Sequence, residues 1–222
     1  MSIVILHGAL GSSHQFQRFA QHGMIVEFFG HGTTADVDEP WTMDLFAHQL
    51  ESLLTSTPVL RSPVSVFGYS MGGYVALMVA QRRPDLIGRI LTLGTKLAWS
   101  TEQAQNEVKM LNADVIEQKV PAFAADLQHR HGTDRWRTVL AKTADLMIDL
   151  GNDPRLTPSR MNEISIPVRY MVGDRDEMVT LEETVHFHRA TPGSELAVLP
   201  GTRHPIEKVR QEIIDRHVEE FL

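Results

Sequence analysis

The chain has 222 residues, enough for one globular domain with a sizeable core, and 42% of them are hydrophobic, as in ordinary globular proteins. Its 21 basic and 28 acidic residues give a formal charge of −7, which argues against nucleic acid binding because such binding needs a basic face. The absence of cysteine excludes disulfides, thiolate metal sites and cysteine nucleophiles. The N-terminus MSIVILHGALG has no basic region and too short an apolar run for a secretion signal, so we expect a cytoplasmic protein without a membrane partner.

Short β-branched runs, each bounded by glycine or proline, predict strands buried on both faces of a parallel sheet. In chain order they are Ser2–Leu6, Met24–Phe28, Val64–Phe67, Arg89–Leu93, Val168–Val172 and Glu195–Leu199. Helical spacing of apolar residues follows several of them, over Trp41–Thr55, Tyr74–Arg82 and Ile206–Leu222. This alternation predicts a doubly wound α/β sheet of about six strands.

About sixty residues, 97–161, pass without a strand pattern and predict a helical insertion between two strands of the sheet. Apolar spacing indicates three helices there: one that keeps residues 104–115 on a single face, a short one opened by Pro121, and one that starts near Trp136. The expected organisation is therefore a core made of residues 1–96 and 162–222, with the insertion as a separate helical unit.

Ser70 lies in Gly68-Tyr69-Ser70-Met71-Gly72, which fits G-x-S-x-G between a predicted strand and a predicted helix. To expose its hydroxyl at the sheet edge, such a serine adopts an unfavourable backbone conformation, and side chains two residues before and after it would clash. The following helix also directs its N-terminal amides at a developing oxyanion. A tight structural turn is the simpler alternative, but the strand and helix on either side favour a nucleophile.

A serine nucleophile needs a base to take its proton, and the base needs an acid to orient it. His204 lies in the loop between the last predicted strand and the C-terminal helix, so it falls at the same carboxyl edge of the sheet as Ser70. Sites of open α/β sheets lie at that edge. Asp174 and Asp176 both follow the preceding strand, and position alone leaves the acid open between them.

Three further motifs make the chain similar to a known family. The segment His7-Gly8-Ala9-Leu10-Gly11-Ser12 is similar to the H-G-x-x-G-S loop of α/β-hydrolases, and Gly30-His31-Gly32 to their G-x-G turn. Gly173-Asp174-Arg175-Asp176-Glu177-Met178-Val179 is similar to their G-x-x-D-x-x-V acid loop, and the order Ser…Asp…His is that of their triads. The chain thus resembles, over nearly its whole length, an α/β-hydrolase of the small serine esterase, lipase and C–C hydrolase kind.

The resemblance implies both a fold and a set of roles. The fold is a mostly parallel sheet with a helical lid insertion that lacks the family's leading strand pair, because the chain begins almost directly with the strand before His7. Ser70 is then the nucleophile, His204 the base and Asp176 the acid, while Asp174 caps or hydrogen-bonds its own loop. The backbone N–H groups of Ala9 and Met71 would form the oxyanion hole.

Several other residues have both a functional and a structural interpretation. Trp99, Phe123 and Trp136 would line an acyl pocket under the insertion, although helix packing explains them equally well. His129 and His131, two residues apart and without an acid cluster, indicate solvated surface more than a metal site. His7 is expected to form structural hydrogen bonds. No nucleotide-binding glycine motif occurs, so no cofactor is implied. The histidine spacing described above implies no metal either.

The sequence predicts a serine hydrolase that cleaves a carboxylic ester or related small acyl substrate, as a monomer or homodimer. One alternative is a C–C bond lyase similar to the small synthase of menaquinone biosynthesis. Arg130, Arg135 or Arg137 would then hold a carboxylate of the substrate, although we expect those side chains to face solvent. The other alternative is a non-catalytic ligand-binding member of the same fold, which would have no need for Ser70, Asp176 and His204 together.

Overall fold

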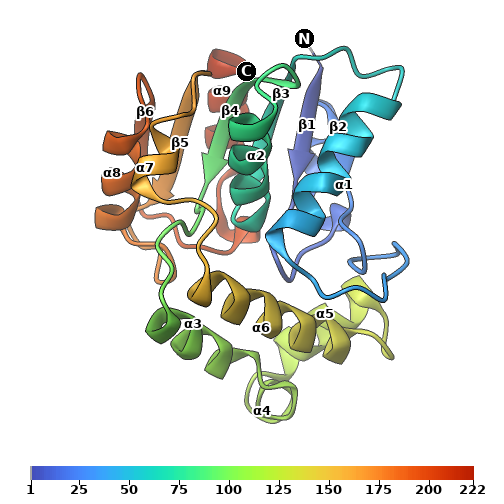
Figure 1. The fold of residues 1–222 in the computed structure, drawn as a ribbon. Coiled ribbons are helices and arrows are strands. Elements are labelled where there is room, and N and C mark those ends of the chain that lie inside the picture. Colours follow the sequence, from blue (N-terminus) through green and yellow to red (C-terminus); the bar gives the residue numbers. More distant parts are fainter. Residues whose placement is uncertain (1) are drawn as a thin grey trace.

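The computed structural model describes residues 2–222, and these residues form one six-stranded sheet in which every neighbouring pair of strands is parallel (Figure 1). The spatial order is β2-β1-β3-β4-β5-β6. In chain order the strands are β1 (Ile3–Leu6), β2 (Met24–Val26), β3 (Val64–Tyr69), β4 (Ile87–Leu93), β5 (Val168–Gly173) and β6 (Glu195–Leu199). The predicted doubly wound α/β architecture is confirmed, and β2 and β6 are the two edges of the sheet.

Helices cover both faces of the sheet, and the alternation of side chains along each strand decides which core each residue joins. Val4 and Val66 pack on one face with α1 (Met43–Ser56), α2 (Met71–Arg82) and α8 (Leu181–Ala190). Ile5 and Phe67 pack on the other with the 3₁₀ helix η1 (Ser13–Phe19) and with α9 (Gln211–Phe221).

One helical prediction in the last part of the chain needs correction, and one helix there was not predicted. The predicted helix Ile206–Leu222 is divided into a 3₁₀ turn, η3 (Ile206–Lys208), and α9, with extended backbone at Val209 and Arg210 between them. Helix α8 had no sequence prediction because its segment LEETVHFHRA buries only Thr184 and Phe187, too little for a clear apolar stripe.

Between β4 and β5 the chain forms five helices, of which the first four lie beyond the carboxyl end of the sheet and the last lies beside α8 (Figure 1). They are α3 (Thr101–Val108), α4 (Ala113–Lys119), α5 (Pro121–His131), α6 (Trp136–Asn152) and α7 (Pro158–Met161), with a 3₁₀ turn, η2 (Lys109–Leu111), after α3. The single helix expected over 104–115 is wrong. Asn112 ends it, because its side chain accepts the Val115 N–H at 3.0 Å and caps a new helix.

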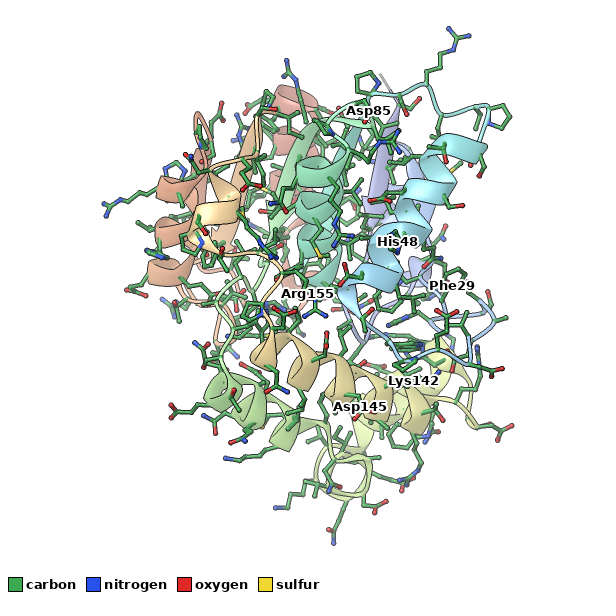
Figure 2. The ribbon with its side chains drawn as sticks, in the orientation of Figure 1. Phe29, His48, Asp85, Lys142, Asp145 and Arg155 are labelled. Atoms are coloured by element: carbon green, nitrogen blue, oxygen red, sulfur yellow. The ribbon has the colours of Figure 1, made fainter. Side chains whose placement is uncertain are left out.

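This helical segment, residues 97–161, has a small core of its own and is tied to the sheet by charges. Trp136 is 2% exposed and packs with Leu127 and Leu140. Arg155, which Figure 2 shows between the sheet and α6, bonds Asp44 Oδ2 of α1 at 2.9 Å and Asp149 Oδ2 of α6 at 2.8 Å. Lys142, also labelled in Figure 2, donates to Asp36 Oδ2 at 2.7 Å and to the Val37 carbonyl at 2.8 Å.

The glycines of G-x-S-x-G are required by close backbone approach. A Cβ on Gly72 would lie 2.6 Å from the Leu6 carbonyl oxygen of β1, and one on Gly68 would lie 2.6 Å from the backbone of Gly73. Neither neighbour is a flexible side-chain end, so neither can move aside. The first turn of α2 therefore packs directly against β1 and β3, which fixes the position of Ser70.

Gly72→Ala is expected to lower the free energy of unfolding by about 2–3 kcal/mol, because the added methyl group overlaps backbone atoms of β1. Without that overlap, alanine would favour the helix by about 1 kcal/mol. Urea denaturation followed by circular dichroism measures the change.

The matched control is Gly193→Ala, where the added Cβ meets no atom within 4 Å and only a φ of +65° opposes it. Its expected cost is about 1 kcal/mol. Equal losses in the two variants would contradict the steric argument at Gly72.

Candidate active site

Ser70 has φ 51° and ψ −118°, and it is the one non-glycine residue with positive φ in the described part of the chain. Its neighbours hold it in this conformation. The Ser70 N–H donates to the Leu93 carbonyl at 2.9 Å, and the Ser70 carbonyl accepts the Thr95 hydroxyl at 3.1 Å. Backbone strain of this kind persists only when the surroundings enforce it, and it concentrates at functional sites.

His204 and Asp176 meet at the same edge of the sheet. His204 Nδ1 lies 2.8 Å from Asp176 Oδ2, and the Asp176 side chain is only 2% exposed. The other carboxylate oxygen accepts the N–H groups of Met178 and Val179 at 2.9 and 2.8 Å. This carboxylate is therefore fixed against the imidazole on one side and against its own loop on the other.

Asp174, the other candidate acid, bonds its surroundings differently. Its Oδ1 accepts the Thr202 N–H at 3.2 Å, which supports the loop that carries His204. The geometry thus places Asp176 on the imidazole and Asp174 in a loop-stabilising position.

Two residues that the sequence analysis did not single out complete this arrangement. Gly94 ends β4, and a Cβ there would lie 3.2 Å from both Asp176 Oδ2 and His204 Nδ1. Tyr69 donates its hydroxyl to the His204 carbonyl at 3.0 Å, and burial raises its pKa, which keeps the hydroxyl protonated as a donor. The signal for Gly94 was present in the sequence: a glycine directly after a buried strand, at the edge where Ser70 lies.

A narrow cavity of about 30 Å³ adjoins Ser70, and both residues predicted for the oxyanion hole, Ala9 and Met71, line it. The wall is apolar apart from Lys96. Besides Trp99, the other residues that line the cavity are Met43, Tyr74, Leu146, Met147, Leu150 and Met178.

Of the three aromatic residues predicted to line this pocket, only Trp99 lies on it. Trp136 belongs to the core of residues 97–161, and Phe123 packs against that core from outside. Their prediction as pocket residues needs correction, because the insertion uses them to hold its own helices together. Lys96 was missed, although it stands three residues after β4 at the carboxyl edge of the sheet. Its Nζ lies 3.3 Å from the Met178 carbonyl and 3.5 Å from Glu107 Oε1.

Comparison with known families matches residues 3–216 to the family model described as "Alpha/beta hydrolase family". The chain belongs to the alpha/beta hydrolase family. The match includes the strand before Ser70 and the loops that carry Asp176 and His204.

Curated relatives of this α/β-hydrolase are enzymes of several kinds. A putative 2-succinyl-6-hydroxy-2,4-cyclohexadiene-1-carboxylate synthase of Bacillus subtilis is 25% identical over 252 residues, covering 100% of this chain and 90% of the relative. A pimeloyl-[acyl-carrier protein] methyl ester esterase of Neisseria meningitidis is 25% identical, covering 91% and 86%. These relatives make the chain an enzyme of the family, and they support a hydrolase.

Solved structures agree on the fold. A serine hydrolase involved in carbazole degradation superposes with a TM-score of 0.78 at 20% identity, covering 100% of this chain and 90% of the other. Within residues 2–222, no helix of this α/β-hydrolase has the length and apolar character needed to cross a membrane.

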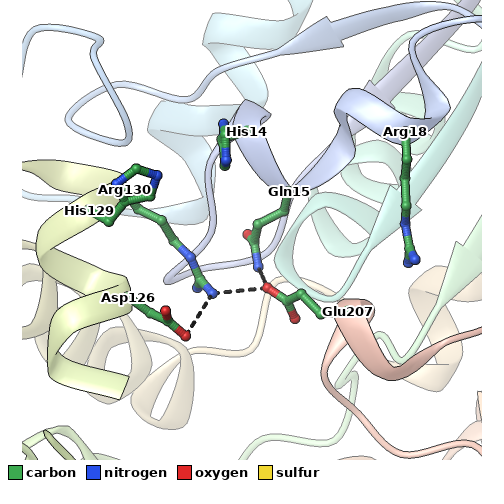
Figure 3. Close-up of a pocket in the computed structure, with 7 residues that line it drawn as sticks. All are labelled: His14, Gln15, Arg18, Asp126, His129, Arg130 and Glu207. Atoms are coloured by element: carbon green, nitrogen blue, oxygen red, sulfur yellow. Dashed lines mark hydrogen bonds and ion pairs between the residues drawn. The ribbon is translucent and has the colours of Figure 1, made fainter. Parts of the chain in front are cut away.

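A larger hollow, about 410 Å³, lies between η1, α5 and η3 (Figure 3). None of the predicted catalytic residues lines it. Several of its polar groups already bond one another: Arg130 Nη2 bonds Glu207 Oε1 at 2.9 Å, and Gln15 Nε2 donates to the same oxygen at 2.5 Å. An open, polar and self-paired surface of this kind offers less to a small acyl ligand than the apolar cavity beside Ser70.

The loop that contains Ala9 rests on buried histidines of the core. His7 accepts the Phe28 N–H on Nε2 at 3.1 Å, so its proton is on Nδ1 and is donated to the Gly8 carbonyl at 2.8 Å. His7 thus has the expected structural role. His31 faces the carbonyls of Phe29 at 2.9 Å and Ala9 at 3.2 Å, and burial keeps its pKa well below the usual value.

The histidines spaced two apart do not behave as one set. His129 is exposed as expected, but His131 is 1% exposed, so its prediction as solvated surface was wrong. Among residues 2–222, no group of three histidine, aspartate or glutamate side chains is arranged to hold a metal ion.

Stability is expected to fall as the pH drops from 6.5 towards 4. Burial lowers the pKa of His7 from 6.5 to about 4, so the unfolded chain binds a proton in this range that the folded chain refuses. The full effect of this residue is about 3 kcal/mol, complete near pH 4 and absent above pH 6.5.

Urea denaturation at several pH values measures this dependence. His7→Asn, which cannot titrate, is expected to flatten the decline, whereas His48→Asn on the exposed side of α1 leaves it unchanged. An identical pH slope for wild type and His7→Asn would contradict the assignment.

Proposed function

We propose that this α/β-hydrolase is a serine hydrolase that cleaves a carboxylic ester or related acyl substrate through a covalent acyl-enzyme. One observation carries the proposal: Ser70, the hydroxyl-bearing residue with enforced positive φ, shares a sheet edge with half-buried His204, which is joined at 2.8 Å to the buried carboxylate of Asp176. A pure binding protein has no use for this combination of strain and buried charge.

The mechanism follows from the positions of the groups. Ser70 Oγ attacks the substrate carbonyl carbon while His204 takes the hydroxyl proton, and Asp176 holds the imidazole in the required tautomer. The N–H groups of Ala9 and Met71 stabilise the oxyanion, and each such donor is worth about 3 kcal/mol. His204 then gives its proton to the leaving alcohol. A water molecule, deprotonated by His204, attacks the acyl-enzyme, and His204 returns that proton to Ser70 Oγ as the acid leaves.

The cavity supports a compact acyl group. Apart from Lys96, the residues that line it around Ser70 are aliphatic, methionine or aromatic, and its volume is about 30 Å³. Helix α6 supplies Leu146, Met147 and Leu150 to this wall, so we propose that residues 97–161 act as a lid that sets the depth of the acyl site.

The C–C lyase alternative has support in the relative described as a putative synthase. The arginines considered for a substrate carboxylate are committed elsewhere, however. Arg130 bonds Glu207, Arg137 bonds Asp114 and Glu117, and Arg135 donates to the Thr34 carbonyl at 2.9 Å. None of the three lines the cavity beside Ser70, so the hydrolase is the better supported proposal.

Ser70→Ala is expected to lower the hydrolysis of p-nitrophenyl acetate and butyrate by at least about 10⁴-fold, because it removes the nucleophile. The measurement is release of p-nitrophenol by wild type and variant at equal concentration. Full activity in Ser70→Ala would rule out the acyl-enzyme mechanism.

A pair of neighbouring substitutions tests the acid. Asp176→Asn is expected to lower kcat by about 10⁴-fold, since the amide no longer fixes the imidazole tautomer. Asp174→Asn, two residues away on the same loop, loses only a bond to Thr202 and is expected to have a far smaller effect. The reverse order of effects would assign the acid to Asp174.

Wild type is expected to prefer acetate over butyrate and octanoate esters. Met147→Ala removes part of the cavity wall and should raise the ratio of kcat/KM for octanoate to that for acetate about tenfold. Met110→Ala, an exposed methionine of the same segment, is the control. An unchanged ratio in Met147→Ala would place the acyl chain elsewhere.

A further inference from the structure

The loop that carries Ala9 is held from two sides. The carbonyls of Gly8 and Ala9 face the core histidines described above. The next carbonyl, that of Leu10, faces a histidine from outside the core: His131, the last residue of α5, lies with its Nε2 3.1 Å away. Three successive carbonyl oxygens of this loop therefore each lie within hydrogen-bonding distance of a different buried imidazole.

His131 bridges two loops of the core. Its Nδ1 accepts the Gly32 N–H at 3.0 Å, so the ring proton is on Nε2 and is donated to the Leu10 carbonyl. Burial lowers the pKa of His131, which keeps the ring neutral with one donor and one acceptor. A neutral imidazole supplies both functions from one side chain.

Other contacts of the same helix support the bridge. Arg130, which Figure 3 shows extending from α5 towards Glu207, also donates to the Leu10 carbonyl at 3.3 Å. The Leu10 side chain packs against the small core of residues 97–161 that contains Trp136. Arg135 donates to the carbonyls of Gly32 and Thr34. The loop thus lies between the core of the sheet and the core of the insertion.

We propose that His131 is a positioning residue that couples the helical insertion to the oxyanion loop, so that the Ala9 N–H points correctly only while α5 is docked. The inference rests on the oxyanion role proposed for Ala9. The Ala9 N–H lies in the same peptide plane as the Gly8 carbonyl, which His7 holds, and the Leu10 carbonyl lies in the plane between Leu10 and Gly11, which His131 holds. With the planes on either side held, the backbone of Ala9 and Leu10 has little freedom left. A displacement of about 1 Å at a reacting group can cost about 10²-fold in rate.

Three variants test the coupling. His131→Phe keeps a ring and removes both hydrogen bonds, whereas His131→Gln keeps a donor and an acceptor. His129→Phe changes an exposed histidine on the same helix and is the matched control. Circular dichroism and thermal midpoints establish that each variant folds. If His131→Phe does not fold, the same measurements on His131→Gln carry the test.

Two readouts are compared in each variant: kcat and KM for p-nitrophenyl acetate, and hydrogen exchange of the amides of residues 8–12. His131→Phe is expected to lower kcat about 10- to 100-fold with KM nearly unchanged. It should also accelerate exchange in residues 8–12 but not in β3. His131→Gln should recover part of both, and His129→Phe should match wild type.

Unchanged exchange in His131→Phe would overturn the coupling, and faster exchange with wild-type kcat would overturn its importance for catalysis. Failure of the proposed function has a different signature, namely ester turnover by wild type that Ser70→Ala leaves intact. In that event the catalytic role of His131 falls as well, while the exchange measurement still decides whether α5 holds the loop.

Discussion

The reversal of the chain at Ser70 is the constraint on which the rest of this α/β-hydrolase depends. The turn forces a non-glycine residue to φ 51°, and α2 starts there in direct backbone contact with β1 and β3. Such a conformation is unfavourable in isolation and survives because fully buried neighbours enforce it. The parallel sheet supplies those neighbours: β3 lies at its centre, between β1 and β4.

The position of the turn in the sheet also determines what surrounds it. Because all strands are parallel, every loop at the carboxyl edge converges there, and the loops after β5 and β6 bring Asp176 and His204 into contact. Strand β4 lies between β3 and β5, and the residue that follows it must lack a side chain so that the His204–Asp176 pair has space. Gly94 meets that requirement. Sheet order and side-chain size therefore act together on the proposed triad.

The helical segment of residues 97–161 contacts both the cavity and the loop that contains Ala9. It supplies one wall of the cavity through α6, and through His131 and Arg130 of α5 it reaches the loop proposed for the oxyanion hole. Buried neutral imidazoles suit this task, because each offers one donor and one acceptor without a charge to desolvate. The same burial makes these histidines a source of acid sensitivity in the folded state.

The sequence by itself determined the α/β class, the strand positions, the serine turn and the position of His204 at the same sheet edge, because these depend on local patterns: apolar runs, glycine spacing and loop position. Tertiary structure decided which residues face the cavity and which face one another. Trp136 lies in the core of residues 97–161 and Phe123 packs against it, while Lys96 lines the cavity. His131, expected on the surface, is buried between two loops. Residues in helices joined by short loops can turn towards either neighbour, and only the packing of the insertion against the sheet decides between them.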